Sequence, residues 1–209
     1  MATINLQKGQ KIDLTKGNPG LSKITVGLGW DEVSASAKPK SGILGSLFGG
    51  GGAGSAAAID CDASAILLND QNKLTSKANL VYFGNLQSGD KSVKHSGDNL
   101  TGAGEGDDEQ IQVDLSQVPS EVQKIVFVVN IYDSQKRKQD FGLISNAFIR
   151  VVNPVNDQEF CRYNLTESYA GKTSLVVAEV YRHNNEWKFA AIGEGTNDAS
   201  LSELVRRYQ

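Results

Sequence analysis

The chain has 209 residues, 39% of them hydrophobic, and a mean hydropathy of −0.31, which is ordinary for a globular protein. Its formal net charge is −3 and its pI is near 5.4, so it lacks the basic excess of a general nucleic-acid binder. The two cysteines, Cys61 and Cys161, lie too far apart to suggest a disulfide framework. We therefore predict a single domain over residues 1–209 that does not bind nucleic acid.

Targeting and membrane signals are missing from the sequence pattern. The first residues lack the apolar core of a signal peptide, and no run approaches the roughly 18 apolar residues of a membrane span. We therefore expect a cytoplasmic protein that is not an integral membrane protein.

Short runs of β-branched and aromatic residues, separated by turn residues, dominate the chain and predict an all-β fold. Residues 124–131 are nearly all apolar, as expected for a central strand buried on both faces. His183, Asn184 and Asn185 separate the last two runs, and asparagine tolerates the positive φ of a tight hairpin. The expected strands are 21–28, 60–68, 79–83, 110–115, 124–131, 147–152, 159–163, 174–182 and 186–192.

The C-terminal tail has the pattern of a short helix. Ser200 and Glu203 have the spacing of a capping box. An apolar stripe follows at helical spacing and is expected to dock on a sheet: Leu201, Leu204, Val205 and Tyr208.

Residues 38–58 differ from the rest in composition. They are rich in Gly, Ser and Ala, which indicates a flexible insertion loop. Four apolar residues within it form a candidate docking patch if they are exposed: Ile43, Leu44, Leu47 and Phe48.

The stretch 96–109 is the most informative part of the chain. It contains five carboxylates and no Lys or Arg: Asp98, Glu105, Asp107, Asp108 and Glu109. Most charge runs are solvated faces, and that interpretation stays open here. Carboxylates packed this densely repel one another, and glycines between them allow tight turns. A Ca²⁺ ion, which takes about six to eight oxygen ligands, would relieve the repulsion.

A second acidic element is Asp60-x-Asp62-x-Ser64, which reads as part of a strand. Alternate side chains of a strand share one face, so these three side chains point the same way. The spacing also imitates the start of an EF-hand. However, Ala65 replaces the turn glycine and Gln71 replaces the bidentate glutamate, which excludes an EF-hand.

The number of oxygen donors favours about two Ca²⁺ ions. Mg²⁺ is disfavoured because it keeps its waters, and Zn²⁺ because no His or Cys cluster accompanies the acids. The candidate donors are Asp60, Asp62, Asp98, Asp107, Asp108 and Glu109, with Asp31, Asn99 and Asn146 as additional candidates.

Several segments resemble the TerD family of bacterial tellurite-resistance and stress-response proteins. They include Val-Gly-Leu-Gly-Trp-Asp at 26–31, His-Ser-Gly-Asp-Asn at 95–99 and Glu-Gly-Asp-Asp-Glu-Gln-Ile at 105–111. The matching segments at 5–14, 60–64, 145–148 and 181–188 occur in family order, so the resemblance covers nearly the whole chain.

The resemblance implies a β-sandwich of two mainly antiparallel sheets, a non-enzymatic role and about two bound Ca²⁺ ions. It implies that the partners are other tellurite-resistance or stress proteins, with a membrane protein complex as a further candidate. The long insertion 38–58 is similar to the TerZ-like or TerX-like branch. The implied ligands are Asp31, Asp60, Asp62, Asp98, Asn99, Asp107, Asp108 and Glu109.

Two other functions stay open. One is a Ca²⁺-dependent enzyme acting on phosphate-containing metabolites, for which His95 is the obvious candidate base. The other is an adaptor that uses Ca²⁺ to contact acidic lipids or a membrane partner. Cys61 is expected on the apolar face of its strand, which argues against thiol chemistry.

Overall fold

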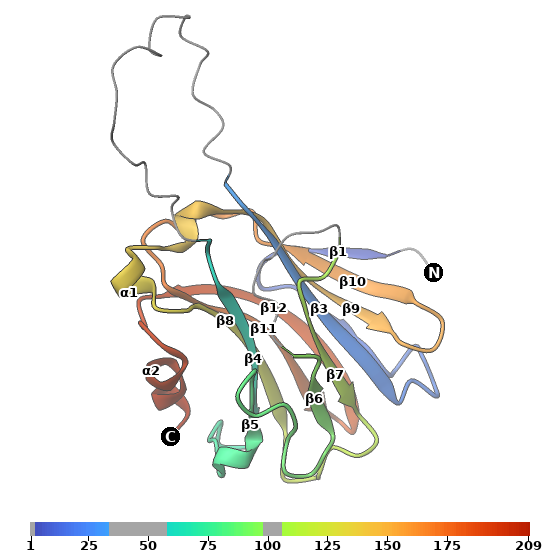
Figure 1. Cartoon of the computed structure of the whole chain (residues 1–209). Helices are drawn as coiled ribbons and strands as arrows, with labels where there is room; N and C mark the ends of the chain where they lie inside the picture. The colour runs from blue at the N-terminus through green and yellow to red at the C-terminus, as the bar shows by residue number, and fades with distance from the viewer. Residues whose placement is uncertain (1–2, 34–57, 98–105) are drawn as a thin grey trace, which may run out of the picture.

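The computed structural model describes residues 3–33, 58–97 and 106–209, and in it two sheets pack face to face (Figure 1). Sheet A has the order β1 (Ile4–Leu6), β10 (Gln158–Asn164), β9 (Ile144–Asn153), β3 (Lys23–Glu32), β7 (Glu109–Asp114) and β6 (Val93–His95). Sheet B has the order β2 (Lys11–Asp13), β12 (Glu186–Thr196), β11 (Ser174–His183), β8 (Lys124–Ile131), β4 (Cys61–Leu68) and β5 (Leu80–Val81). The pairs are antiparallel except β1–β10, which confirms the predicted β-sandwich.

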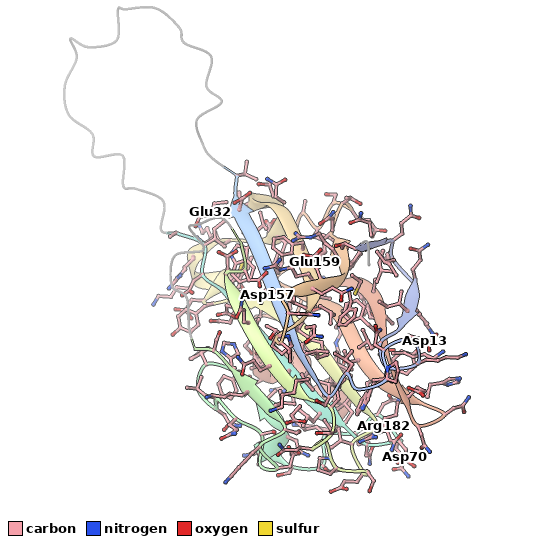
Figure 2. The ribbon with its side chains drawn as sticks, turned by 90° about the vertical axis from the view of Figure 1, so that its right-hand side faces the viewer. Asp13, Glu32, Asp70, Asp157, Glu159 and Arg182 are labelled. Atoms are coloured by element: carbon pink, nitrogen blue, oxygen red, sulfur yellow. The ribbon has the colours of Figure 1, made fainter. Side chains whose placement is uncertain are left out.

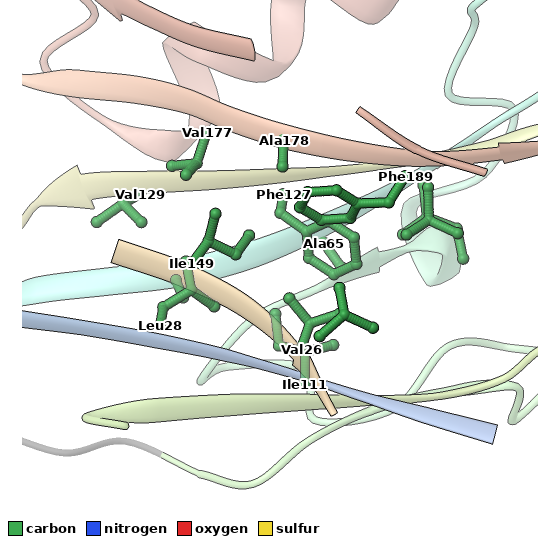
Figure 3. Packing of buried hydrophobic residues seen from close by; sticks show 14 of the residues in the cluster. Val26, Leu28, Ala65, Ile111, Phe127, Val129, Ile149, Val177, Ala178 and Phe189 are labelled. Atoms are coloured by element: carbon green, nitrogen blue, oxygen red, sulfur yellow. The ribbon is translucent and has the colours of Figure 1, made fainter. Parts of the chain in front are cut away.

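The main core lies between the two sheets because alternate residues of each strand face inward. Val26 and Leu28 of β3 lie opposite Phe127 of β8 and Phe189 of β12, and all four side chains are buried (Figure 3). Burying branched and aromatic side chains in this way supplies most of the stabilisation of such a sandwich.

Strand β8 is buried on both faces, as its sequence predicts. Phe127 belongs to the core between the sheets, whereas Val126 and Val128 belong to a second cluster on the outer face of sheet B. Helix α2 (Leu201–Val205) covers that face with Leu204 and Val205 (Figure 1). The apolar stripe of the tail therefore docks on the sheet, as expected.

The start of α2 differs in one detail from a capping box. The Ser200 hydroxyl accepts a hydrogen bond from the Glu203 amide at 3.3 Å, as predicted. The Glu203 carboxylate, however, accepts from the amide of Ala199 at 2.8 Å, one residue earlier than the pattern implies. The helix ends at Val205 and continues as the 3-10 turn η3 (Arg206–Tyr208).

Element boundaries depart from the sequence pattern where backbone pairing decides them. β4 begins at Cys61, so Asp60 precedes the strand, and β3 continues through Trp30 and Asp31 to Glu32. The hairpin between β11 and β12 is confirmed, with Asn184 and Asn185 at φ of 50° and 62°.

The sequence pattern did not predict several short elements. They are β1, β2, β6, the one-turn helix α1 (Ser134–Arg137) and the 3-10 turns η1 (Lys77–Asn79) and η2 (Phe141–Leu143). Except for its last residue, the predicted flexible insertion 38–58 lies outside the described residues, as does its apolar patch. In the described segments, no helix has the length and apolar character needed to cross a membrane.

Candidate metal centre

Gly27 and Gly29 of β3 lie at positions whose side chains would face the outer side of sheet A, and neighbouring groups fill the space where those side chains would be. A Cβ built on Gly27 would lie 2.2 Å from the carboxylate of Asp107. A Cβ on Gly29 would lie 2.5 Å from the ring of Phe148 and 2.7 Å from the carbonyl of Gly106. Close packing therefore requires the two glycines, because Gly106 and Asp107 of the acidic stretch 96–109 lie directly on β3.

Arg150 holds the carboxylate of Asp107 in the space beside Gly27. Nε and Nη2 of Arg150 donate to the two carboxylate oxygens at 2.7 and 3.0 Å, and the Asp107 side chain is 2% exposed. Nε2 of Gln110 donates to the same carboxylate at 3.0 Å. The bidentate pair neutralises Asp107 and satisfies both of its oxygens.

Arg150 also belongs to a longer ion-pair network on the outer face of sheet A. Its Nη1 donates to Glu159 at 3.0 Å, and Glu159 accepts from Arg162 at 3.1 and 3.2 Å. The guanidinium of Arg162 lies 4.0 Å from the ring centroid of Phe148. Figure 2 shows Glu159 among the strands of sheet A.

Asp108 points to a different partner. Its Oδ2 accepts a hydrogen bond from the Trp30 amide at 2.7 Å. Burial raises the pKa of Asp108, and this amide bond opposes the rise. Neighbouring carboxylates raise the pKa further: Asp31, Asp107 and Glu109. Asp108 therefore lies in a region of crowded negative charge, where a cation would be favoured.

Asp31 lies beside a β-bulge in β9. Gly29 pairs with Phe148 and Asp31 with Ser145, so β9 has one extra residue in this interval. Asn146 within it has a φ of 51°, and its Nδ2 donates to Oδ2 of Asp31 at 2.8 Å. The bulge thus places the Asn146 amide against the carboxylate.

Asp60 and Asp62 lie at the start of β4 in sheet B. Nη1 of Arg137 is 3.6 Å from Oδ2 of Asp60. Asp62 is 4% exposed and pairs across the strands with Asn130 of β8, whose Nδ2 donates to its Oδ2 at 3.4 Å. Oδ1 of Asn130 is buried and has no hydrogen-bond partner within the described residues. Ser64, the third residue of the predicted set, is buried too.

Glu109 is buried between the two sheets. Its Oε2 accepts from the Ala63 amide at 2.6 Å and lies 3.4 Å from Nε2 of His95, which is also 3.1 Å from the Ala63 carbonyl. Burial lowers the pKa of His95, but the hydrogen bond and charge of Glu109 outweigh it and raise that pKa. Oε1 of Glu109 has no hydrogen-bond partner in the described part of the chain.

The predicted ligands thus fall into separate groups. Asp31 and Asp108 lie at the C-terminal end of β3, Asp60 and Asp62 lie on either side of Cys61, the first residue of β4, and Asp107 is paired with Arg150. Asp98 and Asn99 lie outside the described residues. Across residues 3–33, 58–97 and 106–209, no three His, Cys, Asp or Glu side chains are grouped closely enough to hold a metal ion. Among these residues, a complete metal site would therefore need further ligands besides His, Cys, Asp and Glu side chains.

A cavity of about 850 Å³ opens beside Asp31. Among the described residues, its lining includes Trp30, Phe148, Arg162 and Asn164 but no histidine. His95 lies elsewhere, with a side chain that is 0% exposed. The histidine considered as a general base therefore does not line this cavity.

The cysteines are buried and free. Cys61 faces the core between the sheets, as predicted, and burial raises the pKa of its thiol well above the ordinary value. Burial also raises the pKa of Cys161, to about 12. Burial therefore disfavours the reactive thiolate form of both cysteines at neutral pH.

Sequence reasoning missed Arg150 and Asn130. Both lie at alternate positions of strands whose intervening residues are apolar, so the strand pattern places them on the outer faces. It does not reveal that Arg150 reaches Asp107 or that Asn130 faces Asp62, because both contacts join distant segments.

The fold and these acidic groups define a class of β-sandwich proteins that carry carboxylates on both sheets, at the end of β3, at the start of β4 and after the segment 98–105. The TerD domain model matches residues 1–208, and the chain belongs to this family. It is 58% identical to stress response protein SCP2 of Bacillus subtilis (strain 168), over 98% of each chain. It is 48% identical to general stress protein 16U of the same strain, over 92% of this chain and 91% of that protein.

The tellurium resistance protein TerD of Serratia marcescens is 43% identical over 92% of this chain and 91% of its own. TerX and TerZ of Serratia marcescens are also among the relatives, at 37% and 38% identity over 99% and 96% of this chain.

Solved structures support the fold. SAV2460, a protein of unknown function, superimposes with a TM-score of 0.66 over 91% of this chain and 99% of its own, at 20% identity. A homologue of the telluride resistance protein TerD from Streptomyces coelicolor A3(2) superimposes with a TM-score of 0.62, over 88% and 98%, also at 20% identity.

Proposed function

We propose that this TerD-family protein is a non-enzymatic, cytoplasmic Ca²⁺-binding protein of a bacterial tellurite and chemical-stress response. The observation that carries the proposal is the crowding of carboxylates at the end of β3, where Oδ2 of Asp108 accepts from the Trp30 amide at 2.7 Å, beside Asp31 and between Asp107 and Glu109 in the chain. Burial and, to a lesser extent, these three acids raise the pKa of Asp108. Such repulsion destabilises a fold unless a cation offsets it, and an all-oxygen donor set suits Ca²⁺.

Because the acids of the described residues lie in separate groups, we infer about two Ca²⁺ ions at separate sites and not one ion bound by all of them. Asp31 and Asp108 would contribute to one site at the C-terminal end of β3, and Asp60 and Asp62 to another at the start of β4. Oε1 of Glu109 is a further buried oxygen without a hydrogen-bond partner in the described part of the chain. Bound ions would offset the carboxylate repulsion and link the acidic segment to both sheets. Asp98 and Asn99 are proposed as the remaining side-chain donors.

The enzymatic alternative receives less support. It needs an ion beside a cavity that also holds a general base, and His95, the base considered for it, does not line the 850 Å³ cavity next to Asp31. We therefore retain a binding role. As partners we propose other stress-response and tellurite-resistance proteins, because relatives carry those names. A membrane protein complex is a further candidate.

Calorimetric titration with Ca²⁺, matched by titration with Mg²⁺, tests the proposal. We expect about two Ca²⁺ ions per chain, weaker Mg²⁺ binding, and a melting temperature that rises with Ca²⁺ because the ligand binds the folded state. Asp62→Asn and Asp108→Asn should each weaken one site. Absence of binding at millimolar Ca²⁺ would exclude the proposed function.

A further inference from the structure

Asp107, Asp108 and Glu109 are consecutive in sequence but have three unrelated partners. Asp107 bonds the Arg150 guanidinium, Asp108 the amide of Trp30, and Glu109 the amide of Ala63. A single cage would require these carboxylates to converge, whereas each is held by a donor on a different strand. The three acids are therefore expected to have different roles.

We propose that Asp107 is a positioning residue and not a metal ligand: the Asp107–Arg150 pair anchors the acidic segment on sheet A and so presents Asp108 beside Asp31. This inference rests on the proposed Ca²⁺ function and corrects the ligand set that the family resemblance implies. The remaining metal-binding carboxylates keep the roles proposed above.

Geometry supports the anchor in two independent ways. Both oxygens of Asp107 are occupied by Arg150, at 2.7 and 3.0 Å, in a side chain that is 2% exposed. Oδ2 of Asp107 accepts from both Arg150 and Gln110, and a metal ion bound at Oδ1 would lie beside the partly buried guanidinium of Arg150, where the two positive charges repel. The absence of a side chain at Gly27 also lets the Asp107 carboxylate pack directly against β3, because a Cβ at that position would lie 2.2 Å from it.

The anchor also fixes its neighbour. With Asp107 held over β3, the Asp108 amide donates to the Leu28 carbonyl at 2.8 Å, and the Asp108 carboxylate accepts from Trp30 at 2.7 Å. These bonds place Asp108 next to the end of β3 that carries Asp31. Arg150 is in turn fixed by Glu159 at 3.0 Å, so the anchor is part of the sheet's own ion-pair network.

A double-mutant cycle of Asp107→Asn and Arg150→Gln, measured by urea unfolding in EDTA and again in saturating Ca²⁺, tests this assignment. In EDTA we expect Asp107→Asn to lower the folding equilibrium constant about tenfold in the wild type, and less than about threefold in the Arg150→Gln background. The same coupling should persist in Ca²⁺. Arg150→Lys should restore it only in part, because lysine cannot bond both oxygens.

Ion counting on the folded variants separates a positioning residue from a metal ligand. Asp107→Asn should keep the wild-type number of bound Ca²⁺ ions with an affinity less than about tenfold weaker, whereas its isosteric neighbour Asp108→Asn should lose one ion. Additive effects in EDTA, coupling that disappears in Ca²⁺, or an ion lost from Asp107→Asn would each overturn the assignment. If the wild type binds no Ca²⁺, the proposed function fails, and the cycle in EDTA alone decides whether the anchor exists.

Discussion

The Glu109 carboxylate of sheet A accepts a hydrogen bond from the Ala63 amide of sheet B at 2.6 Å. His95, also from sheet A, lies 3.1 Å from the Ala63 carbonyl. β5 pairs with β4 only at Ala65 and Ile66, so on that side Ala63 of β4 has no neighbouring strand among the described residues. Side chains from the facing sheet satisfy its backbone groups instead. A residue of the acidic run thus joins the two layers.

Removing this bond should destabilise the protein without any metal. We expect Glu109→Ala, measured by urea unfolding in EDTA, to lower the free energy of unfolding by about 2–4 kcal/mol. The reason is that the Ala63 amide loses its acceptor in a buried position. Glu121→Ala, at an exposed position, is the control and should change stability by less than about 0.5 kcal/mol. Equal effects would show that Glu109 is not a structural link.

The close packing at Gly27 predicts that alanine is tolerated there less well than at another glycine, Gly17. Gly27→Ala should lower the free energy of unfolding by about 1–3 kcal/mol, because the new methyl group would overlap the Asp107 carboxylate. At Gly17, apart from its chain neighbours, no described residue has an atom within 4 Å of the place a methyl group would take, so Gly17→Ala should be tolerated. Thermal unfolding of both variants in EDTA checks this, and a stable Gly27→Ala protein would contradict it.

The C-terminal helix depends on its first residue. Ser200→Ala should cost about 1 kcal/mol in the free energy of unfolding, because the Glu203 amide loses its acceptor. Ser200→Asp, which restores an accepting oxygen, should recover most of the loss. The measurement is chemical denaturation of the three proteins. No difference between wild type and Ser200→Ala would mean that packing of Leu204 and Val205 alone holds the helix.

Glu159 should give the protein a defined acid sensitivity. Burial raises the pKa of this carboxyl, but the hydrogen bonds from Arg162 and Arg150 outweigh it and lower the pKa below its ordinary value of 4.5. The ionised form therefore stabilises the fold above about pH 4.5, and this contribution is lost as the pH falls through the folded-state pKa.

Urea midpoints of wild type and Glu159→Gln across this range test the prediction. The wild type should be the more stable at neutral pH, and the difference should shrink as the solution is acidified below pH 4.5. A difference that stays constant with pH would show that the carboxyl does not titrate differently in the folded state.

The two thiols should be unreactive in the folded protein. Cys61 and Cys161 are buried, and burial raises the pKa of both. We expect a thiol reagent such as DTNB to label neither cysteine quickly at pH 8, and both after unfolding. Rapid labelling of the native protein would show that the region around one of them opens readily.

The alternation of the strands could be predicted because side-chain direction along a strand is a local property. Cys61 and Asp62 occupy opposite faces as the period of two requires, and the nearly all-apolar β8 is buried on both faces. The shortest elements escaped prediction because three residues such as Val93–His95 carry too little pattern, and pairing with β7 makes them a strand.

The order of residues along the chain was enough to establish an all-β protein of the TerD family, with carboxylates concentrated in two segments. The hydrogen-bond partners of Asp107 and Glu109 became clear only in three dimensions. Asp107 pairs with Arg150, and Glu109 with Ala63, across 43 and 46 residues. The physical reason is that a carboxylate's role depends on the donor it meets in space. Here the strand order of the two sheets, and not the spacing of acids along the chain, brings each donor into reach.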